Sequence, residues 1–448
     1  MSAPMTSGPK APTIAELAAA LAAGHTTSVA LTEAALAKIE RHRDAGGAAF
    51  MSVDAQGALA QARAADQARA AGYVASPLAG LPISIKDLFD VRGQVTRAGS
   101  KALEGSAPAQ ADAPAVARLR AAGAVLIGRT NMSEFAFSGL GLNPHYGTPR
   151  TPFDAACISG GSTSGGAVSV AEEMAVAALG TDTGGSIRIP SAFCGLTGFK
   201  PTARRVPLDG AVPLSTSLDS AGPLARSVAC CVAMDAVLSG ETLDTRAADL
   251  RGARLYVTRD FVGEGLDAAV AQAFEATLGL LSAQGAQIVE FDFPGLRRLP
   301  EINAAGGLTA AEAWAWHRTL LQEKGDQYDQ RVAQRIRRGE KLTAADYIAL
   351  LAERRAMQQS AAQRLRDADA WLMPSVAVRP PRLDALERDE DFFATNGLVL
   401  RNASVINFLD GCAASLPMGD GMGLGVCGLH GRDARVLQVS AAIEQALA

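Results

Sequence analysis

The chain has little of what marks nucleic-acid-binding, membrane and secreted proteins. Its 448 residues include 42 Lys and Arg against 46 Asp and Glu, a formal net charge of −4. This balance gives no basic excess to attract nucleic acid or an anionic membrane surface. No apolar run approaches the ~18–20 residues that a membrane-spanning helix needs. The N-terminus, MSAPMTSGPK, also lacks the charged-then-apolar order of a signal peptide. We therefore expect a cytoplasmic protein with no nucleic-acid or membrane partner.

Cysteine and histidine are scarce as well. The cysteines form no C-x-x-C pair of the kind found in metal sites. In a long chain without a secretion signal we expect them to be reduced, with several in the core. Among the five histidines, only His145 lies in a Gly-, Pro- and aromatic-rich loop that could form a pocket wall. It is the one histidine kept as an alternative catalytic base.

What the chain does contain indicates a large α/β protein. Apolar residues make up 48% and charged residues 20%, enough for a sizeable core. Two strand-like runs, 253–257 and 286–293, bracket a helical segment near 267–283, which is a β-α-β order. We expect a single α/β domain over 1–448, with a central mixed β-sheet flanked on both faces by α-helices. Its expected parts are N-terminal helices (13–71), a core (about 78–230 and 370–448) and a helical cover (about 300–368).

The block from 159 to 201 contains two Gly/Ser clusters, GGSTSGG and TDTGGSIR, which include Ser162 and Ser186. Neither cluster fits the phosphate-loop, dinucleotide-binding or G-x-S-x-G patterns. Glycines let backbone amides turn toward a ligand, so a serine among them could be a nucleophile beside an oxyanion hole. The structural alternative is two tight turns flanking a helix of small residues.

A serine nucleophile needs a base, and one lysine is well placed. The run Pro82–Ile85 predicts a buried strand with Lys86 at its carboxyl end. A lysine there is ordinarily a solvated loop residue, but open α/β sheets collect their sites at strand ends. Lowering a lysine pKa by ~3 units costs ~4 kcal/mol of desolvation, which Ile83, Ile85 and Leu88 could supply.

These motifs together resemble the amidase signature family. The resemblance is carried by Gly160–Thr202, Pro82–Asp87, the run GRTNMSEFA at 128–136 and the segment Asp219–Val228, and it covers nearly the whole chain. One departure is that Thr163 stands where serine is usual in the family, and Ser164 where glycine often occurs.

The resemblance implies a Ser-Ser-Lys mechanism. Ser186 would attack the amide carbonyl, while Ser162, after a cis Gly161–Ser162 bond, would relay the proton to a neutral Lys86. The resemblance also implies supporting roles for other residues. These are the backbone amides of Thr183, Gly184, Gly185 and Ser186 as oxyanion hole, Asp182 and Arg188 as loop support, and Ala136, Phe137 and Ser138 as substrate contacts.

The implied function is hydrolysis of a carboxamide to a carboxylic acid plus ammonia or an amine. No metal or organic cofactor is implied, the expected partner is a small-molecule amide substrate, and a homodimer is left open. One alternative is the glutaminase subunit of a tRNA-dependent amidotransferase; a catalytically inactive binding protein is another. We expect specificity to be set by 132–150, 203–220 and 300–340, which contain no readable substrate code.

Overall fold

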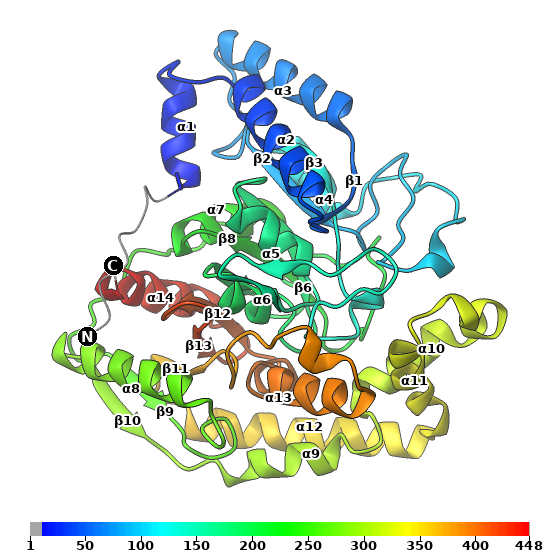
Figure 1. Ribbon diagram of the computed structural model, residues 1–448. Coiled ribbons are helices and arrows are strands. Elements are labelled where there is room, and N and C mark those ends of the chain that lie inside the picture. Colours follow the sequence, from blue (N-terminus) through cyan, green and yellow to red (C-terminus); the bar gives the residue numbers. More distant parts are fainter. Residues whose placement is uncertain (1–10, 448) are drawn as a thin grey trace.

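A computed structural model describes residues 11–447 and contains, within them, an 11-stranded mixed sheet (Figure 1). In sheet order the strands are β1 (Phe50–Val53), β3 (Val125–Thr130), β2 (Pro82–Lys86), β6 (Ala177–Asp182), β8 (Ser220–Ala225), β7 (Thr197–Lys200), β12 (Cys412–Pro417), β13 (Gly423–Gly428), β11 (Ala370–Pro374), β9 (Arg254–Val257) and β10 (Gln287–Glu290). The β3-β2-β6 and β11-β9-β10 groups are parallel, and the strands between them pair antiparallel. A separate pair is formed by β4 (Arg150–Thr151) and β5 (Asp154–Ile158).

Helices cover both faces of this sheet, which confirms the predicted fold class. They are α1 (Ile14–Ala22), α2 (Ser28–Asp44), α3 (Ala55–Ala70), α4 (Pro114–Ala121), α5 (Ser164–Ala171), α6 (Arg188–Phe193), α7 (Val228–Ser239), α8 (Ala268–Ala283), α9 (Leu299–Ile302), α10 (Gly307–Lys324), α11 (Gln330–Arg337), α12 (Ala344–Arg364), α13 (Asp389–Phe408) and α14 (Asp433–Leu447).

Alternation along the strands shows the two covered faces. Successive side chains of a strand point to opposite faces. In β11, Leu372 packs in the core shared with α7, α8 and α14, whereas Trp371 and Met373 pack in a second core with α12 and α13. Both faces of β11 are thus buried, which explains why AWLMP is apolar along its whole length rather than alternating with polar residues.

Most local predictions are confirmed, and the misses have a physical cause. The spacing of Thr343 and Asp346 predicts a capping box at the start of a helix, and α12 begins with it. The Gly and Pro of 218–228 predict a loop that leads into a helix, but this segment contains β8, a buried central strand. Its sequence, SAGPLA, has none of the β-branched or aromatic residues that favour strands, so pairing with β6 and β7 decides its structure. The Pro- and charge-rich composition of 376–395 predicts a loop over that whole range, but the loop is shorter because α13 starts at Asp389.

The described cysteines and helices bear on two further expectations. All six cysteines, Cys157, Cys194, Cys230, Cys231, Cys412 and Cys427, are free and buried. Between residues 11 and 447, no helix is both long and apolar enough to cross a membrane. α9 to α12 occupy the stretch predicted as a helical cover, and α10 contacts both α11 and α12 (Figure 1).

Candidate active site

Three segments that are far apart in the sequence meet at one edge of the sheet. β2 and β6 are parallel, with Ile85 opposite Leu179, so their carboxyl ends reach this edge together. The third segment is the loop before α5. A hydrogen bond from the Thr163 amide to the Ser186 carbonyl (3.2 Å) joins it to the loop that follows β6. Lys86, Ser162 and Ser186 are thereby brought to the same place.

Lys86 lies fully buried at the end of β2. Its Nζ donates to Ser162 Oγ (2.8 Å) and to Thr181 Oγ1 (2.8 Å). Burial lowers the pKa of Lys86 to about 7, although the charges of Asp219 and Asp182 act to raise it. A neutral amine is therefore accessible near neutral pH, as a general base requires.

The loop before α5 presents Ser162 to this lysine. The Gly161–Ser162 peptide bond is cis, as expected. Ser162 is fully buried, and its carbonyl accepts a hydrogen bond from the Ser133 amide (3.2 Å). Of the two contacts expected of a bridging serine, the one to Lys86 is present, and no hydrogen bond joins the Ser162 and Ser186 hydroxyls in the part of the chain described.

The departure at Thr163 has a packing explanation. A Cβ added to Gly166 or Gly180 would lie 2.7 or 2.8 Å from Thr163 Cγ2. The threonine methyl therefore occupies space above these two glycines, where a serine would have no carbon atom. The neighbouring Ser164 is buried as the first residue of α5.

The turn that carries Ser186 is held by a buried ion pair. The Asp182 carboxylate accepts from the amides of Gly185 (2.8 Å) and Ile187 (3.1 Å) and from Arg188 Nε (3.0 Å) and Nη2 (2.9 Å). Burial acts to raise the pKa of Asp182, but the Arg188 charge and hydrogen bonds hold it below its usual range. Asn407 of α13 also bonds both side chains.

One of the four amides expected to form the oxyanion hole is already engaged. The Gly185 amide donates to Asp182, so the structure corrects that part of the prediction: a donor aimed at a carboxylate is not free for a substrate oxygen. The amides of Thr183, Gly184 and Ser186 have no hydrogen-bond partner among residues 11–447.

A cavity of about 730 Å³ opens onto Ser186. The residues predicted to contact substrate, Ala136, Phe137 and Ser138, line it together with Thr183 and Gly184. The predicted specificity segments 203–220 and 300–340 contribute Leu214, Leu218 and several residues between Pro300 and Arg338. α13 was missed as a wall of this cavity, and it supplies Asn396, Leu400, Arg401, Ser404 and Phe408, among others.

Two polar residues of the site, Thr181 and Asp219, lie in segments that carry the family resemblance, but no role was predicted for them. Thr181 binds Lys86, and Asp219 accepts from Thr183 Oγ1 (2.5 Å) and from the amides of Leu214 and Ser215. Burial raises the pKa of Asp219 to about 6. His145, the alternative base, bonds Glu134 (3.0 Å) and is absent from the cavity wall.

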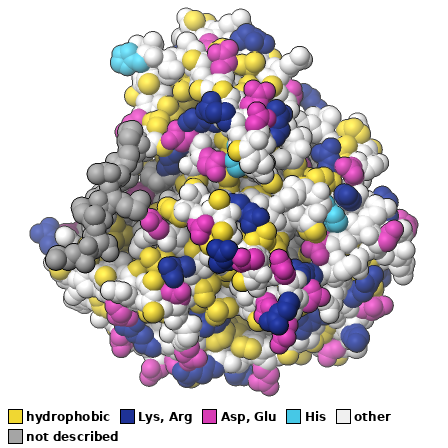
Figure 2. All heavy atoms as spheres, viewed as in Figure 1, with side chains coloured by type: hydrophobic (Ala, Val, Ile, Leu, Met, Phe, Trp, Pro, Cys, Tyr) yellow, Lys and Arg dark blue, Asp and Glu magenta, His cyan; other side chains and the backbone are white. Residues whose placement is uncertain are grey.

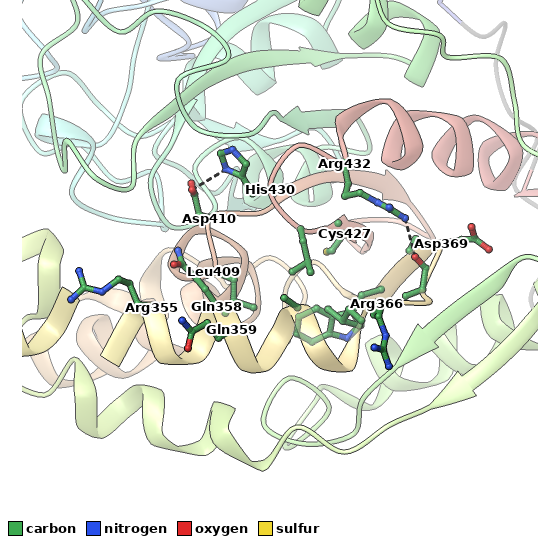
Figure 3. Close-up of a pocket in the computed structure, with 17 residues that line it drawn as sticks. Arg355, Gln358, Gln359, Arg366, Asp369, Leu409, Asp410, Cys427, His430 and Arg432 are labelled. Carbon is green, nitrogen blue, oxygen red and sulfur yellow. Dashed lines mark hydrogen bonds and ion pairs between the residues drawn. The ribbon is translucent and has the colours of Figure 1, made fainter. Parts of the chain in front are cut away.

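A second cavity, of about 710 Å³, lies between α12 and strands β11 and β13 (Figure 3). Positive and negative side chains both line it, including Arg355, Arg366, Asp369 and Asp410. Figure 3 shows Asp410 bonded to His430, an interaction of 3.0 Å. None of the predicted catalytic residues lines this cavity.

Comparison with known proteins agrees with this geometry. The sequence profile of the amidase family, described as "Amidase", matches residues 30–437. The chain is 35% identical to 2-amino-5-chloromuconic acid deaminase from Comamonas testosteroni, over 96% of this chain and 95% of that protein. The crystal structure of an amidase superposes on this chain with a TM-score of 0.89 and 36% identity, covering 97% of this chain and 99% of the other.

A further group of relatives matches over a shorter length. One of the subunits of glutamyl-tRNA(Gln) amidotransferase from Streptomyces coelicolor is 43% identical over 297 residues. This match spans 63% of the chain and 59% of that relative. The profile match, the full-length relative and the full-length structural neighbour agree with one another. The chain therefore belongs to the amidase signature family and is a hydrolase that acts on carbon–nitrogen amide bonds.

Proposed function

We propose that the chain hydrolyses a carboxamide to a carboxylic acid and ammonia or an amine, through an acyl intermediate on Ser186. The observation that carries the proposal is the buried Lys86, whose Nζ binds Ser162 within a loop bonded to the Ser186 turn. A lysine in this setting can act as a base for serine. A relative named as a deaminase supports ammonia as the nitrogen product.

The proposed chemistry conserves protons. Ser186 Oγ attacks the carbonyl carbon, and its proton passes through Ser162 to the neutral Lys86. The amides of Thr183, Gly184 and Ser186 stabilise the oxyanion, and each such donor is worth roughly 10²–10³ in rate. The carbon–nitrogen bond then breaks, and Lys86 returns its proton through Ser162 to the leaving nitrogen. Water then attacks the acyl group on Ser186 with the same transfer of a proton to Lys86. The bond to Ser186 Oγ breaks, the proton returns to that oxygen, and the acid is released.

The test is covalent labelling of the nucleophile. We expect a fluorophosphonate to modify the wild-type protein on Ser186, located by mass spectrometry of tryptic peptides. Ser186→Ala should lose both the label and ammonia release from small amides while keeping its circular dichroism spectrum. A label on Ser162 or on a cysteine would contradict the assignment.

The alternatives predicted from the sequence are separated by the same assays. A glutaminase that works within a larger amidotransferase would release ammonia from glutamine only with its partner chains. A binding protein would neither be labelled nor release ammonia from any amide. Ammonia release by the isolated chain, lost in Ser186→Ala, would support the stand-alone amidase.

A further inference from the structure

Among residues 11–447, arginine is the only charged residue type in the wall of the Ser186 cavity. Arg335, Arg338 and Arg401 line it, and no aspartate, glutamate or lysine of residues 11–447 does. Two of the three come from the cover and one from α13, so the positive charges enter from separate parts of the chain. The same cavity contains Ser186, the proposed nucleophile.

Arg335 lies beside the residues expected to contact substrate. Its guanidinium is 4.4 Å from the centre of the Phe137 ring, and its Nη1 donates to the Phe137 carbonyl. No carboxylate in the described part of the chain forms an ion pair with it. Burial lowers the pKa of Arg335 to about 10, and the charge of Arg338 adds to this effect. The group is still a cation at neutral pH, and several of its N–H donors have no hydrogen-bond partner among the residues that the structure describes.

The other two arginines, Arg338 and Arg401, likewise form no ion pair with a carboxylate of residues 11–447. Arg338 donates to the Ala304 carbonyl. Arg401 donates to Asn402 Oδ1 (3.0 Å) and the Val262 carbonyl (3.4 Å), and it lies 5.8 Å from the Phe261 ring. All three guanidinium groups thus contact neutral acceptors or aromatic rings, and no carboxylate of residues 11–447 lies within ion-pair distance of them.

This concentration of one charge contrasts with the rest of the molecule. The chain as a whole carries −4, and Figure 2 shows basic and acidic side chains interspersed over the visible face. The second cavity contains both signs. A cleft lined by one sign between low-dielectric walls focuses the field and concentrates ligands of the opposite sign.

We propose that the substrate is an amide bearing a carboxylate, and that Arg335, assisted by Arg338 and Arg401, binds that carboxylate while the amide lies at Ser186. A guanidinium binds a carboxylate with two parallel hydrogen bonds, so it fixes orientation as well as charge. The apolar wall, which includes Leu218 and Phe393, suits the hydrocarbon between the two groups. This inference rests on the proposed amidase function.

The experiment compares two amides that differ only at the far end. One is glutaramic acid, and the other has an isopropyl group in place of its carboxylate. We expect the wild-type protein to release ammonia from the anionic amide with the higher kcat/KM. In Arg335→Ala the ratio of the two kcat/KM values should fall by about 10- to 100-fold, chiefly through KM of the anionic amide. Arg335→Lys should give a ratio between those of Arg335→Ala and the wild type, because lysine keeps the charge but lacks the paired guanidinium donors.

Arg355→Ala is the matched control, since it removes one arginine charge from α12 at the second cavity (Figure 3). It should keep the wild-type ratio. Should Arg335→Ala fail to fold, Arg338→Ala and Arg401→Ala should lower the same ratio. Added salt should likewise raise KM for the anionic amide alone.

A wild-type preference for the neutral amide, or a ratio unchanged in all three cavity variants, would overturn the carboxylate proposal. Fluorophosphonate labelling of Ser186 separates this result from failure of the function itself. If Ser186 is labelled and the neutral amide is hydrolysed, the amidase stands and only the substrate class is wrong. If neither amide is hydrolysed and Ser186 is unlabelled, both proposals fall.

Discussion

Two buried lysines show how a residue's partners decide its chemistry. Lys86 and Lys200 are both almost fully buried in strands. Lys86 donates to two side-chain hydroxyls, whereas Lys200 donates to the carbonyls of Pro201 (2.9 Å) and Gly411 (2.6 Å). A hydroxyl can pass a proton on and a main-chain carbonyl cannot. Only Lys86 is therefore placed to act as a base.

The lowered pKa of Lys86 predicts how activity depends on pH. Only the neutral amine can accept a proton, so kcat/KM should fall as pH drops through about 7. Well below that pH the decrease should approach about tenfold per unit. The measurement is a pH profile of ammonia release, with Lys200→Met as control: its midpoint should stay near the wild-type value even if its stability falls. A profile flat from pH 5 to 9, chosen to span about two units on each side, would remove Lys86 from the mechanism.

At the scale of elements, the turn between β6 and α6 depends on glycines with different requirements. Gly185 has a φ of +126°, and a Cβ there would lie 2.5 Å from Ile189 Cδ1 and 2.7 Å from Ala403 Cβ. A Cβ on Gly184 would meet nothing nearer than 3.6 Å. Ile189 of α6 and Ala403 of α13 therefore leave no room for a side chain at Gly185, whereas Gly184 has room for a Cβ.

This difference predicts unequal costs of two neighbouring substitutions. Gly185→Ala should lower the free energy of unfolding by about 1–3 kcal/mol, through backbone strain and steric overlap. Gly184→Ala serves as the matched control and should change it by less than about 1 kcal/mol. Urea unfolding followed by circular dichroism measures both. Equal losses in the two variants would mean that Ile189 and Ala403 do not constrain this turn.

Across the whole molecule, the cover is joined to the core by an aromatic cluster beside the cavity. Phe135, next to Ala136, stacks on Tyr328 with ring centres 4.9 Å apart and meets His317 edge-on at 4.4 Å. His317 Nδ1 lies 2.9 Å from the Tyr328 hydroxyl. Burial lowers the pKa of His317 to about 3. The packing of α10 against Phe135, which precedes the cavity residue Ala136, thus depends on a neutral His317.

The buried histidine predicts how stability responds to acid. Its pKa is lower in the folded than in the unfolded state, so below about pH 6.5 the unfolded chain binds the extra proton. Stability is lost as pH falls, by up to about 1.4 kcal/mol per unit from this residue. His317→Phe should make the plot of unfolding free energy against pH shallower between 6.5 and 4.5, a window of about two units. The exposed His25→Phe is the control, and the same slope in both variants would place His317 in solvent.

Much of the fold and of the site could be predicted from short stretches of sequence. The starts of helices α1 and α12 are indicated by Thr13 and Thr343, because each forms a capping box with a residue only three positions away. Lys86 at a strand end and Ser186 among glycines were recognisable for the same reason, because the residues next to them in the sequence indicate their possible role. β8 was not, because its strand structure comes from pairing with β6 and β7.

The sequence by itself determined which residues can react, because reactive type and local backbone freedom are properties of a few adjacent residues. Only the tertiary structure decided which of these residues lie together and which of their donors and acceptors are already hydrogen-bonded. Asp182 accepts a hydrogen bond from the Gly185 amide and leaves the other predicted oxyanion-hole amides unbonded within the described chain. Thr181 accepts from Lys86 of the neighbouring strand. Arg335 donates to the Phe137 carbonyl from 198 positions further along the chain. Such contacts arise when long-range packing closes large loops, and no local pattern records which side chains will then meet.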